Sequence, residues 1–223
     1  MFKSLMVVIT LALASTTAAV AEPTDMETSE VLYRGTGVSY DETNHTATIR
    51  GSTTSTQATA LSHLVRENDV IVVTMFGPGG DFYAGLRMGR MLQREGVVVI
   101  IPKNTSCISA CAFMALAGER VILHENSTLL FHTPYVTHVP VGVTILDIVN
   151  NFAGAYYDMT SYLVDVNIPL PFGRYLIDST SPCKFIAITE QESINQLMTG
   201  DDVTSRRIFS YTIEDLCNPP PRR

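Results

Sequence analysis

Residues 70–92 read VIVVTMFGPGGDFYAGLRMGRML, and this stretch determines the class of fold. It opens with an unbroken run of apolar and β-branched residues at 70–76, which is typical of a strand buried on both faces of a sheet. Residues 77–80 are then expected to break the strand, because glycine and proline interrupt regular structure. Apolar residues return at helical spacing and stop at Gly96. The pattern predicts a buried strand, a tight glycine turn and a helix.

The same alternation continues on both sides of this stretch. A helix is expected at 55–67, a second apolar strand at 97–101, a helix at about 108–117 and strands at 120–123 and 129–132. Strands that alternate with helices imply parallel pairing through right-handed crossovers. The sequence thus predicts an α/β fold. Further elements are expected as short strands at 31–40 and 45–49, a mainly helical stretch at 143–166, a short helix at 172–177, a strand at 185–188 and a last helix at 190–198.

Length and composition favour one folded domain. The chain has 223 residues, of which 46% are hydrophobic and 17% charged, so it is long and apolar enough to bury a core and is not intrinsically disordered. The formal net charge of −7 argues against a nucleic-acid partner. We expect a signal peptide at 1–21, an N-terminal arm with short strands at 22–44, the α/β domain at 45–205 and a C-terminal extension at 206–223.

The N-terminus has the layout of a secretory signal peptide. Lys3 precedes an apolar stretch at 5–14, and small residues follow up to Ala21. This order predicts cleavage before Glu22 and a periplasmic or secreted protein. A membrane anchor is the alternative, but the apolar run is shorter than the roughly 20 residues that span a bilayer. No later segment looks long and uncharged enough to cross a membrane after cleavage.

Four cysteines in an exported chain favour disulfides. Three pairings are possible, and sequence spacing suggests Cys107 with Cys111 and Cys183 with Cys217. Side chains one helical turn apart are too distant for a disulfide, so Cys107 should lie just before its helix. A metal site using these thiols with His124 or His132 is a weak alternative, because the thiol spacing is not that of structural zinc. We expect no metal.

Two strand-to-helix turns are candidate sites, since ligands in parallel sheets bind outside the carboxyl ends of the strands. The glycine turn at 77–80 lacks the third glycine of a dinucleotide fingerprint, where Phe82 stands, and lacks the ending of a phosphate-binding loop. No nucleotide cofactor is therefore expected. Its bare backbone can still approach a ligand and present N–H groups.

The second turn contains Ser109 among small residues at the start of a helix. A serine there is usually only a cap, and a lone histidine is usually structural. Yet His132 follows an apolar strand at the same expected sheet edge, where its imidazole could take the proton of the serine hydroxyl. The N–H of Ala110 is free at the helix start and lies beside that hydroxyl.

In order and spacing, the glycine turn 77–80, Gly85, the string Cys107–Cys111 and Phe131-His132 resemble the core of the ClpP/crotonase-like superfamily. The likeness runs from about residue 49 to 203. It is greatest to exported bacterial proteins similar to ClpP, whose nucleophile is commonly framed by two cysteines. The resemblance implies a single domain of stacked ββα units that form a spiral. It also implies self-association into a homo-oligomer.

The resemblance further implies a serine peptidase site acting on a peptide or protein substrate. Nothing in the sequence resembles the unfoldase-docking or ATP-binding apparatus, and an exported protein would lack ATP, so we expect this activity to be ATP-independent. Ser109 would be the nucleophile, His132 its general base, and the N–H groups of Gly79 and Ala110 the oxyanion hole. The triad acid is expected shortly before the strand at 185–188. Residues 181–184 carry no carboxylate there, so Asp178 is the nearest candidate.

Two alternatives remain open. The chain could be a catalytically inactive ClpP-like module that uses the pocket to bind a peptide or a partner. A crotonase-type acyl-CoA enzyme shares the superfamily, but it would need a nucleotide-bearing cofactor and would leave Ser109 without a role. No cofactor is expected for the favoured hydrolase.

Overall fold

The computed structural model describes residues 35–134, 142–200 and 208–212. The predicted signal peptide, the first part of the arm and Cys217 therefore lie outside the described residues. So does most of the predicted C-terminal extension.

A central sheet organises the described part of the chain. It holds nine strands, and its main path runs β1 (Val38–Asp41), β2 (Thr46–Thr53), β3 (Val72–Gly80), β5 (Ser106–Ile108), β7 (Thr128–Phe131), β8 (Lys184–Ile188) and β9 (Ile208–Thr212). Strand β4 (Val98–Ile101) pairs with both β3 and β6 (Arg120–Leu123). All pairs among β2 to β7 are parallel, as the sequence predicted, whereas β1, β8 and β9 join the sheet antiparallel.

Strand β3 lies where the sheet divides. Its first residues, Val72 to Thr74, pair with β4, whereas Gly77 near its end pairs with Cys107 of β5. The carboxyl end of β3 therefore lies beside β5 and the turn that follows it. This division brings the glycine turn next to Ser109.

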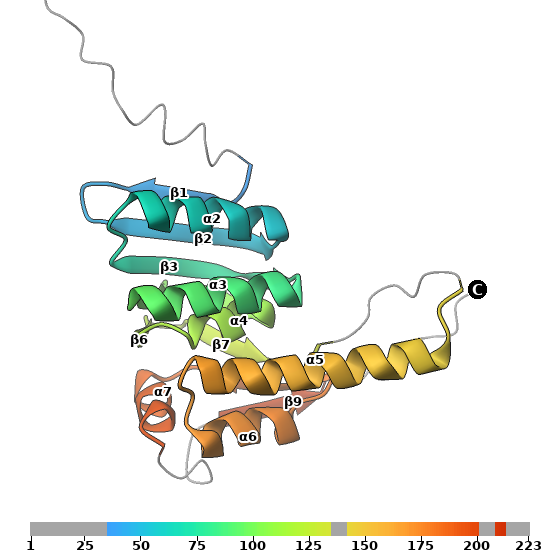
Figure 1. The fold of residues 1–223 in the computed structure, drawn as a ribbon. Coiled ribbons are helices and arrows are strands. Elements are labelled where there is room, and N and C mark those ends of the chain that lie inside the picture. The colour runs from blue at the N-terminus through green and yellow to red at the C-terminus, as the bar shows by residue number, and fades with distance from the viewer. Residues whose placement is uncertain (1–34, 135–141, 201–207, 213–223) are drawn as a thin grey trace, which may run out of the picture.

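Helices alternate with the strands along the described part of the chain. They are α2 (Ser55–Glu67), α3 (Phe82–Glu95), α4 (Ala110–Ala115), α5 (Ile145–Asp165), α6 (Leu170–Ser179) and α7 (Gln191–Met198). Figure 1 shows α2, α3 and α5 stacked one below another in chain order, with α5 extending well beyond the strands. The mixed α/β domain with a central sheet confirms the predicted fold class.

Helix α3 illustrates why the elements form where they do. Asp81 caps its start, accepting a hydrogen bond from the Ala84 N–H at 3.0 Å, and Gly96 ends it with a left-handed φ of 62°. One helix face, which includes Leu86, Met88 and Leu92, is buried in the main hydrophobic core. These caps and this apolar face match the helix that the sequence predicted.

Two local predictions were wrong. The glycine turn does not break the strand: β3 continues to Gly80, because Gly79 and Gly80 pair with the end of β2. The helix expected from 108 begins at Ala110, because residues 106–108 form the short strand β5 against β7. In addition, residues 208–212 form β9 on β8, so the sheet includes part of the segment expected to be a C-terminal extension.

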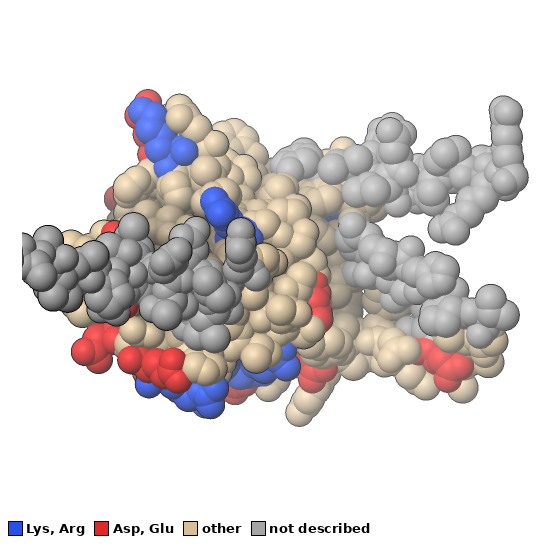
Figure 2. Space-filling view, turned by 90° about the horizontal axis from the view of Figure 1, so that it is seen from above, with Lys and Arg blue, Asp and Glu red and all other residues tan. Residues whose placement is uncertain are grey.

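One face of the molecule carries side chains of both charges. On the face shown in Figure 2, Lys and Arg side chains lie near Asp and Glu, and most of the described surface in this view carries neither. Exposed ion pairs such as Arg174–Asp178 and Lys103–Glu125 also bring opposite charges together on the described surface. None of the helices described is both long and apolar enough to span a membrane.

Tyr162 connects the long helix α5 to the short helix α4. Its side chain is fully buried, and its hydroxyl donates a hydrogen bond to the Phe113 carbonyl at 2.7 Å. That carbonyl belongs to the last turn of α4, where helices leave carbonyl groups without partners. A Cβ added to Gly89 of α3 would overlap with this same hydroxyl. Helices α3, α4 and α5 therefore meet at Tyr162.

We predict strong coupling between Gly89 and Tyr162. Tyr162→Phe should lower the free energy of unfolding by about 1–3 kcal/mol, because it leaves a buried carbonyl without a donor. Gly89→Ala should cost at least as much in the wild type, because the new methyl group overlaps with the hydroxyl. In the Tyr162→Phe background Gly89→Ala should cost about 1 kcal/mol less, which urea denaturation of the four proteins measures. Strictly additive losses would contradict this packing.

Candidate active site

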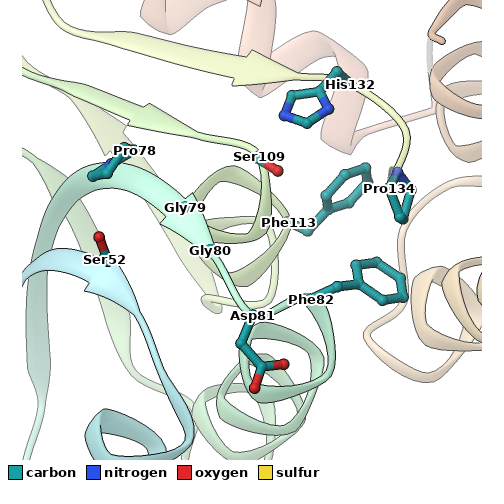
Figure 3. A pocket seen from close by; sticks show the side chains of 10 residues that line it. All are labelled: Ser52, Pro78, Gly79, Gly80, Asp81, Phe82, Ser109, Phe113, His132 and Pro134. Carbon is teal, nitrogen blue, oxygen red and sulfur yellow. The ribbon is translucent and has the colours of Figure 1, made fainter. Parts of the chain in front are cut away.

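A pocket of ≈550 Å³ lies at the carboxyl ends of the parallel strands. It is shown in Figure 3 and is lined by Ser52, Pro78, Gly79, Gly80, Asp81, Phe82, Ser109, Phe113, His132 and Pro134. Residues from β2, β3, the turn before α4 and the end of β7 thus converge on one space. This is the sheet edge at which both candidate turns were expected.

Ser109 occupies a strained turn between β5 and α4. Its φ of 56° and ψ of −124° are unfavourable for a residue with a side chain, at a cost of about 1–3 kcal/mol. The turn is held on both sides: the Ser109 N–H donates to the Leu130 carbonyl at 2.7 Å, and its carbonyl accepts from the Phe113 N–H at 3.0 Å. The hydroxyl makes no capping hydrogen bond, so the side chain does not serve as a helix cap. A sharp strand-to-helix turn of this kind presents a nucleophilic side chain to the pocket.

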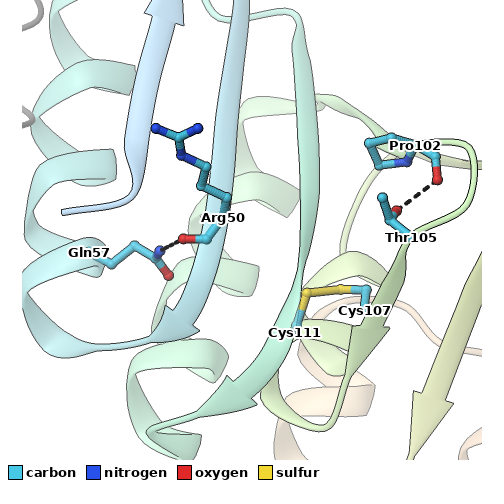
Figure 4. The surroundings of a disulfide bond; sticks show 6 residues. All are labelled: Arg50, Gln57, Pro102, Thr105, Cys107 and Cys111. Carbon is cyan, nitrogen blue, oxygen red and sulfur yellow. Dashed lines mark hydrogen bonds between the residues drawn. A yellow bond between two sulfur atoms is a disulfide. The ribbon is translucent and has the colours of Figure 1, made fainter. Parts of the chain in front are cut away.

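A disulfide closes the same turn. Cys107 lies in β5 and Cys111 in the first turn of α4, with a Cα–Cα distance of 5.2 Å, so the predicted pair is confirmed (Figure 4). Both cysteines are buried, with exposed fractions of 0% and 3%. The covalent link spans Ser109 and restricts the backbone on both sides of it. Since these thiols are joined to each other, the alternative in which they bind a metal is wrong.

Cys183 is also disulfide-bonded. Cys217, the partner expected from the sequence, lies outside the described residues.

Gly79 lies in close contact with the Ser109 turn. Its φ is 81°, and a Cβ added to it would lie 2.5 Å from the Ile108 carbonyl oxygen and 2.8 Å from the Ser109 Cβ. The same Cβ would lie 3.0 Å from the Ala110 nitrogen. Only glycine permits this approach. The backbones of Gly79 and Ala110, the two predicted oxyanion donors, are therefore adjacent, and Ala110 is the first residue of α4, so its N–H has no partner within the helix.

His132 is buried at the end of β7, with 6% of its surface exposed. Its Nδ1 lies 2.8 Å from the Thr133 carbonyl oxygen, and its ring packs against Phe185 at 4.9 Å between centroids. Because a carbonyl only accepts, Nδ1 carries a proton and the neutral ring has its lone pair on Nε2. Burial lowers the pKa of His132 and outweighs the Thr133 hydrogen bond, which raises it. The imidazole is therefore neutral near pH 7 and can act as a base.

Asp178, the candidate acid, does not join this pocket. It lies on α6 with its side chain 62% exposed, and its carboxylate pairs with Arg174 one turn away at 3.3 Å. The group that the structure describes at Nδ1 is the Thr133 main-chain carbonyl, which sequence could not single out, because every residue has one.

The sequence also missed the remaining walls of the pocket. Phe82, Phe113 and Pro134 form an apolar side, and Ser52 and Asp81 contribute polar groups. The signal available for Phe82 and Asp81 was their position directly after the glycine turn. Ser52 depends on the parallel register of β2 with β3, in which it pairs with Gly79 across a bulge. A bulge of this kind is not visible in the sequence pattern.

Comparisons with known proteins bear on the fold. No family model matches the sequence, and no curated protein is similar enough to count as a relative. The chain is similar to a point mutant of ClpP1 from Listeria monocytogenes, with 15% identity, a TM-score of 0.55 and coverage of 74% of this chain and 94% of that chain. At this identity the likeness concerns the fold alone, and the chain has a ClpP-like α/β fold, as the resemblance implied.

Two further solved structures are point mutants of the 1510-N membrane-bound stomatin-specific protease, the second in complex with a substrate peptide. Each is 16% identical, with TM-scores of 0.42 and 0.48 and coverage of 75% and 68% of this chain and 71% and 70% of those chains. Both TM-scores are too low to support further conclusions.

We predict that the Cys107–Cys111 disulfide stabilises the fold by about 2 kcal/mol, since it closes a very short loop in the unfolded chain. Cys107→Ala/Cys111→Ala should therefore unfold at lower urea concentration than wild type. Reductant should destabilise wild type more than this double variant, because only wild type loses this bond. An equal effect of reductant on both proteins would contradict the role of this disulfide.

Proposed function

We propose that this protein is an exported serine peptidase, or a related acyl hydrolase, that cleaves extended peptides without ATP. The observation that carries the proposal is the strained Ser109 turn, which opens into the same pocket as a buried, neutral His132. A hydroxyl becomes a useful nucleophile only beside a base, and the pocket holds both.

The mechanism follows from the positions of these groups. Ser109 attacks the peptide carbonyl carbon while His132 takes the hydroxyl proton on Nε2. The Thr133 carbonyl holds the Nδ1–H, so the ring keeps its orientation as it becomes charged. His132 then gives the proton to the departing amine, and water releases the acyl group from Ser109 by the same steps in reverse.

The N–H groups of Gly79 and Ala110 bind the oxygen of the tetrahedral intermediate. Their backbones are adjacent because Gly79 has no side chain to separate them. Loss of one such donor typically costs about 2.7–4 kcal/mol of transition-state stabilisation. The close contact between Gly79 and the Ser109 turn should therefore affect the rate of peptide hydrolysis as well as the stability of the fold.

A module that only binds peptides is the second candidate. It is favoured by the position of Asp178, which is exposed and paired with Arg174 rather than placed among the residues of the pocket. A binding module would use the same apolar wall but would not need the strained conformation of Ser109. The two candidates therefore differ in the reactivity of one hydroxyl.

Export and self-association are parts of the same proposal. The signal-like N-terminus and the Cys107–Cys111 disulfide support an oxidising compartment, the periplasm or the outside of the cell. The exposed apolar residues Leu146, Val149 and Tyr157 on the projecting helix α5 support a homo-oligomer.

We predict that a fluorophosphonate probe labels the folded protein at Ser109. Ser109→Ala should abolish the labelling, and His132→Gln should slow it by at least about 10²-fold, because general-base help is lost. Labelling is measured by intact-mass spectrometry, with Ser106→Ala on the exposed start of β5 as the matched control. A folded wild-type protein that is not labelled would favour the binding module.

The rate of this labelling should depend on pH through His132. Neutral imidazole is the active form, so the rate should rise with pH as His132 loses its proton. Because burial lowers the pKa, the midpoint should lie below about 6.5, the ordinary value for histidine. The stability of the fold should change with pH in the same direction. The unfolded chain binds a proton at His132 more readily than the folded chain does, so the free energy of unfolding falls as the pH drops below about 6.5. A midpoint above the ordinary value would contradict the burial of a neutral base.

A further inference from the structure

The pocket has an acidic end. Figure 3 shows the Asp81 carboxylate on the side of the pocket away from Ser109 and His132. Among the described residues that line the pocket, Asp81 alone carries a charge near pH 7, because burial keeps His132 neutral. Any ligand that fills the pocket therefore meets one negative charge.

The Asp81 carboxylate has capacity for a further partner. One of its oxygens, Oδ1, accepts the hydrogen bond from the Ala84 N–H that caps α3. In the part of the chain that the structure describes, no Lys, Arg or His forms an ion pair with Asp81. The side chain is exposed at the pocket mouth, and a carboxylate accepts several hydrogen bonds.

An apolar wall leads from the reactive serine toward this charge. Phe82 directly follows Asp81, and Phe113 and Pro134 line the pocket between them and His132 (Figure 3). Lys and Arg side chains combine an apolar stem with a cationic head, and they place the stem on apolar or aromatic surface while the head finds a charge. The pocket offers an apolar wall for the stem and a carboxylate for the cationic head.

We propose that Asp81 is a specificity-determining residue that selects peptides carrying Lys or Arg near the bond held at Ser109. This inference rests on the proposed function only in that a peptide occupies the pocket; it does not require that the peptide be cleaved. Phe82 supports the stem of the basic side chain, and the free oxygen of Asp81 binds its head.

The opposing interpretation is that Asp81 only caps α3. Asn caps helices as well as Asp does, so Asp81→Asn keeps the cap and removes the charge. The test uses two peptides that differ at one position, lysine or the uncharged norleucine. Binding is measured by fluorescence anisotropy in the Ser109→Ala background, which separates affinity from turnover.

We expect Ser109→Ala to bind the lysine peptide about two- to fivefold more tightly than the norleucine peptide, because an ion pair with an exposed carboxylate such as that of Asp81 contributes only modestly to binding. Asp81→Asn should remove most of this ratio. The matched control is Asp147→Asn, which changes a carboxylate at the start of α5 that is not among the residues lining the pocket. This control should preserve the ratio. A ratio that Asp81→Asn leaves unchanged overturns the inference and leaves Asp81 as a cap.

The remaining outcomes separate this inference from the proposed function. Binding that depends on Asp81, without cleavage of the lysine peptide by the protein with Ser109 intact, supports the inference and overturns the peptidase. Cleavage of both peptides at equal kcat/KM supports the peptidase and overturns the inference. Failure of every peptide to bind the folded protein overturns both.

Discussion

The site depends on the close contact between Gly79 and the turn that carries Ser109. A single methyl group at Gly79 would collide with the backbone at Ile108 and Ala110, and backbone cannot move aside as a side chain can. This contact places the end of β3 against the start of α4. The disulfide between Cys107 and Cys111 and the hydrogen bond from Ser109 to Leu130 hold the other sides of the same turn.

The support extends to the far side of α4. This helix has only six residues, too few to be stable alone, and its last turn is held by the Tyr162 hydroxyl from α5. Arg90 of α3 lies over the Tyr162 ring, 5.3 Å from its centroid, and also pairs with Asp165. The projecting helix α5 is thus in direct contact with α4, the helix that directly follows Ser109.

Periodicity and turn residues were enough to predict the parallel sheet, most helices, the Cys107–Cys111 pair and the two turns that meet in the pocket. They failed where pairing between distant strands overrides local preference. Gly79 and Gly80 look like a strand break, but they pair with β2. Ile108 looks like the start of a helix, but it pairs with β7 as the end of β5. The partner of His132 Nδ1 could not be predicted, because a main-chain carbonyl such as that of Thr133 leaves no mark in the sequence.

The backbone conformation at Ser109 lowers the stability of the fold, but it places the hydroxyl where the proposed activity needs it. Glycine would adopt a φ of 56° without penalty, so replacing the serine would relax the turn and make the chain harder to unfold. A pocket that served only to bind peptides could therefore carry glycine at position 109. Ser109 instead keeps a strained backbone conformation that lowers the stability of the fold. A pocket that only binds peptides would not need this strain, so it favours catalysis over binding alone.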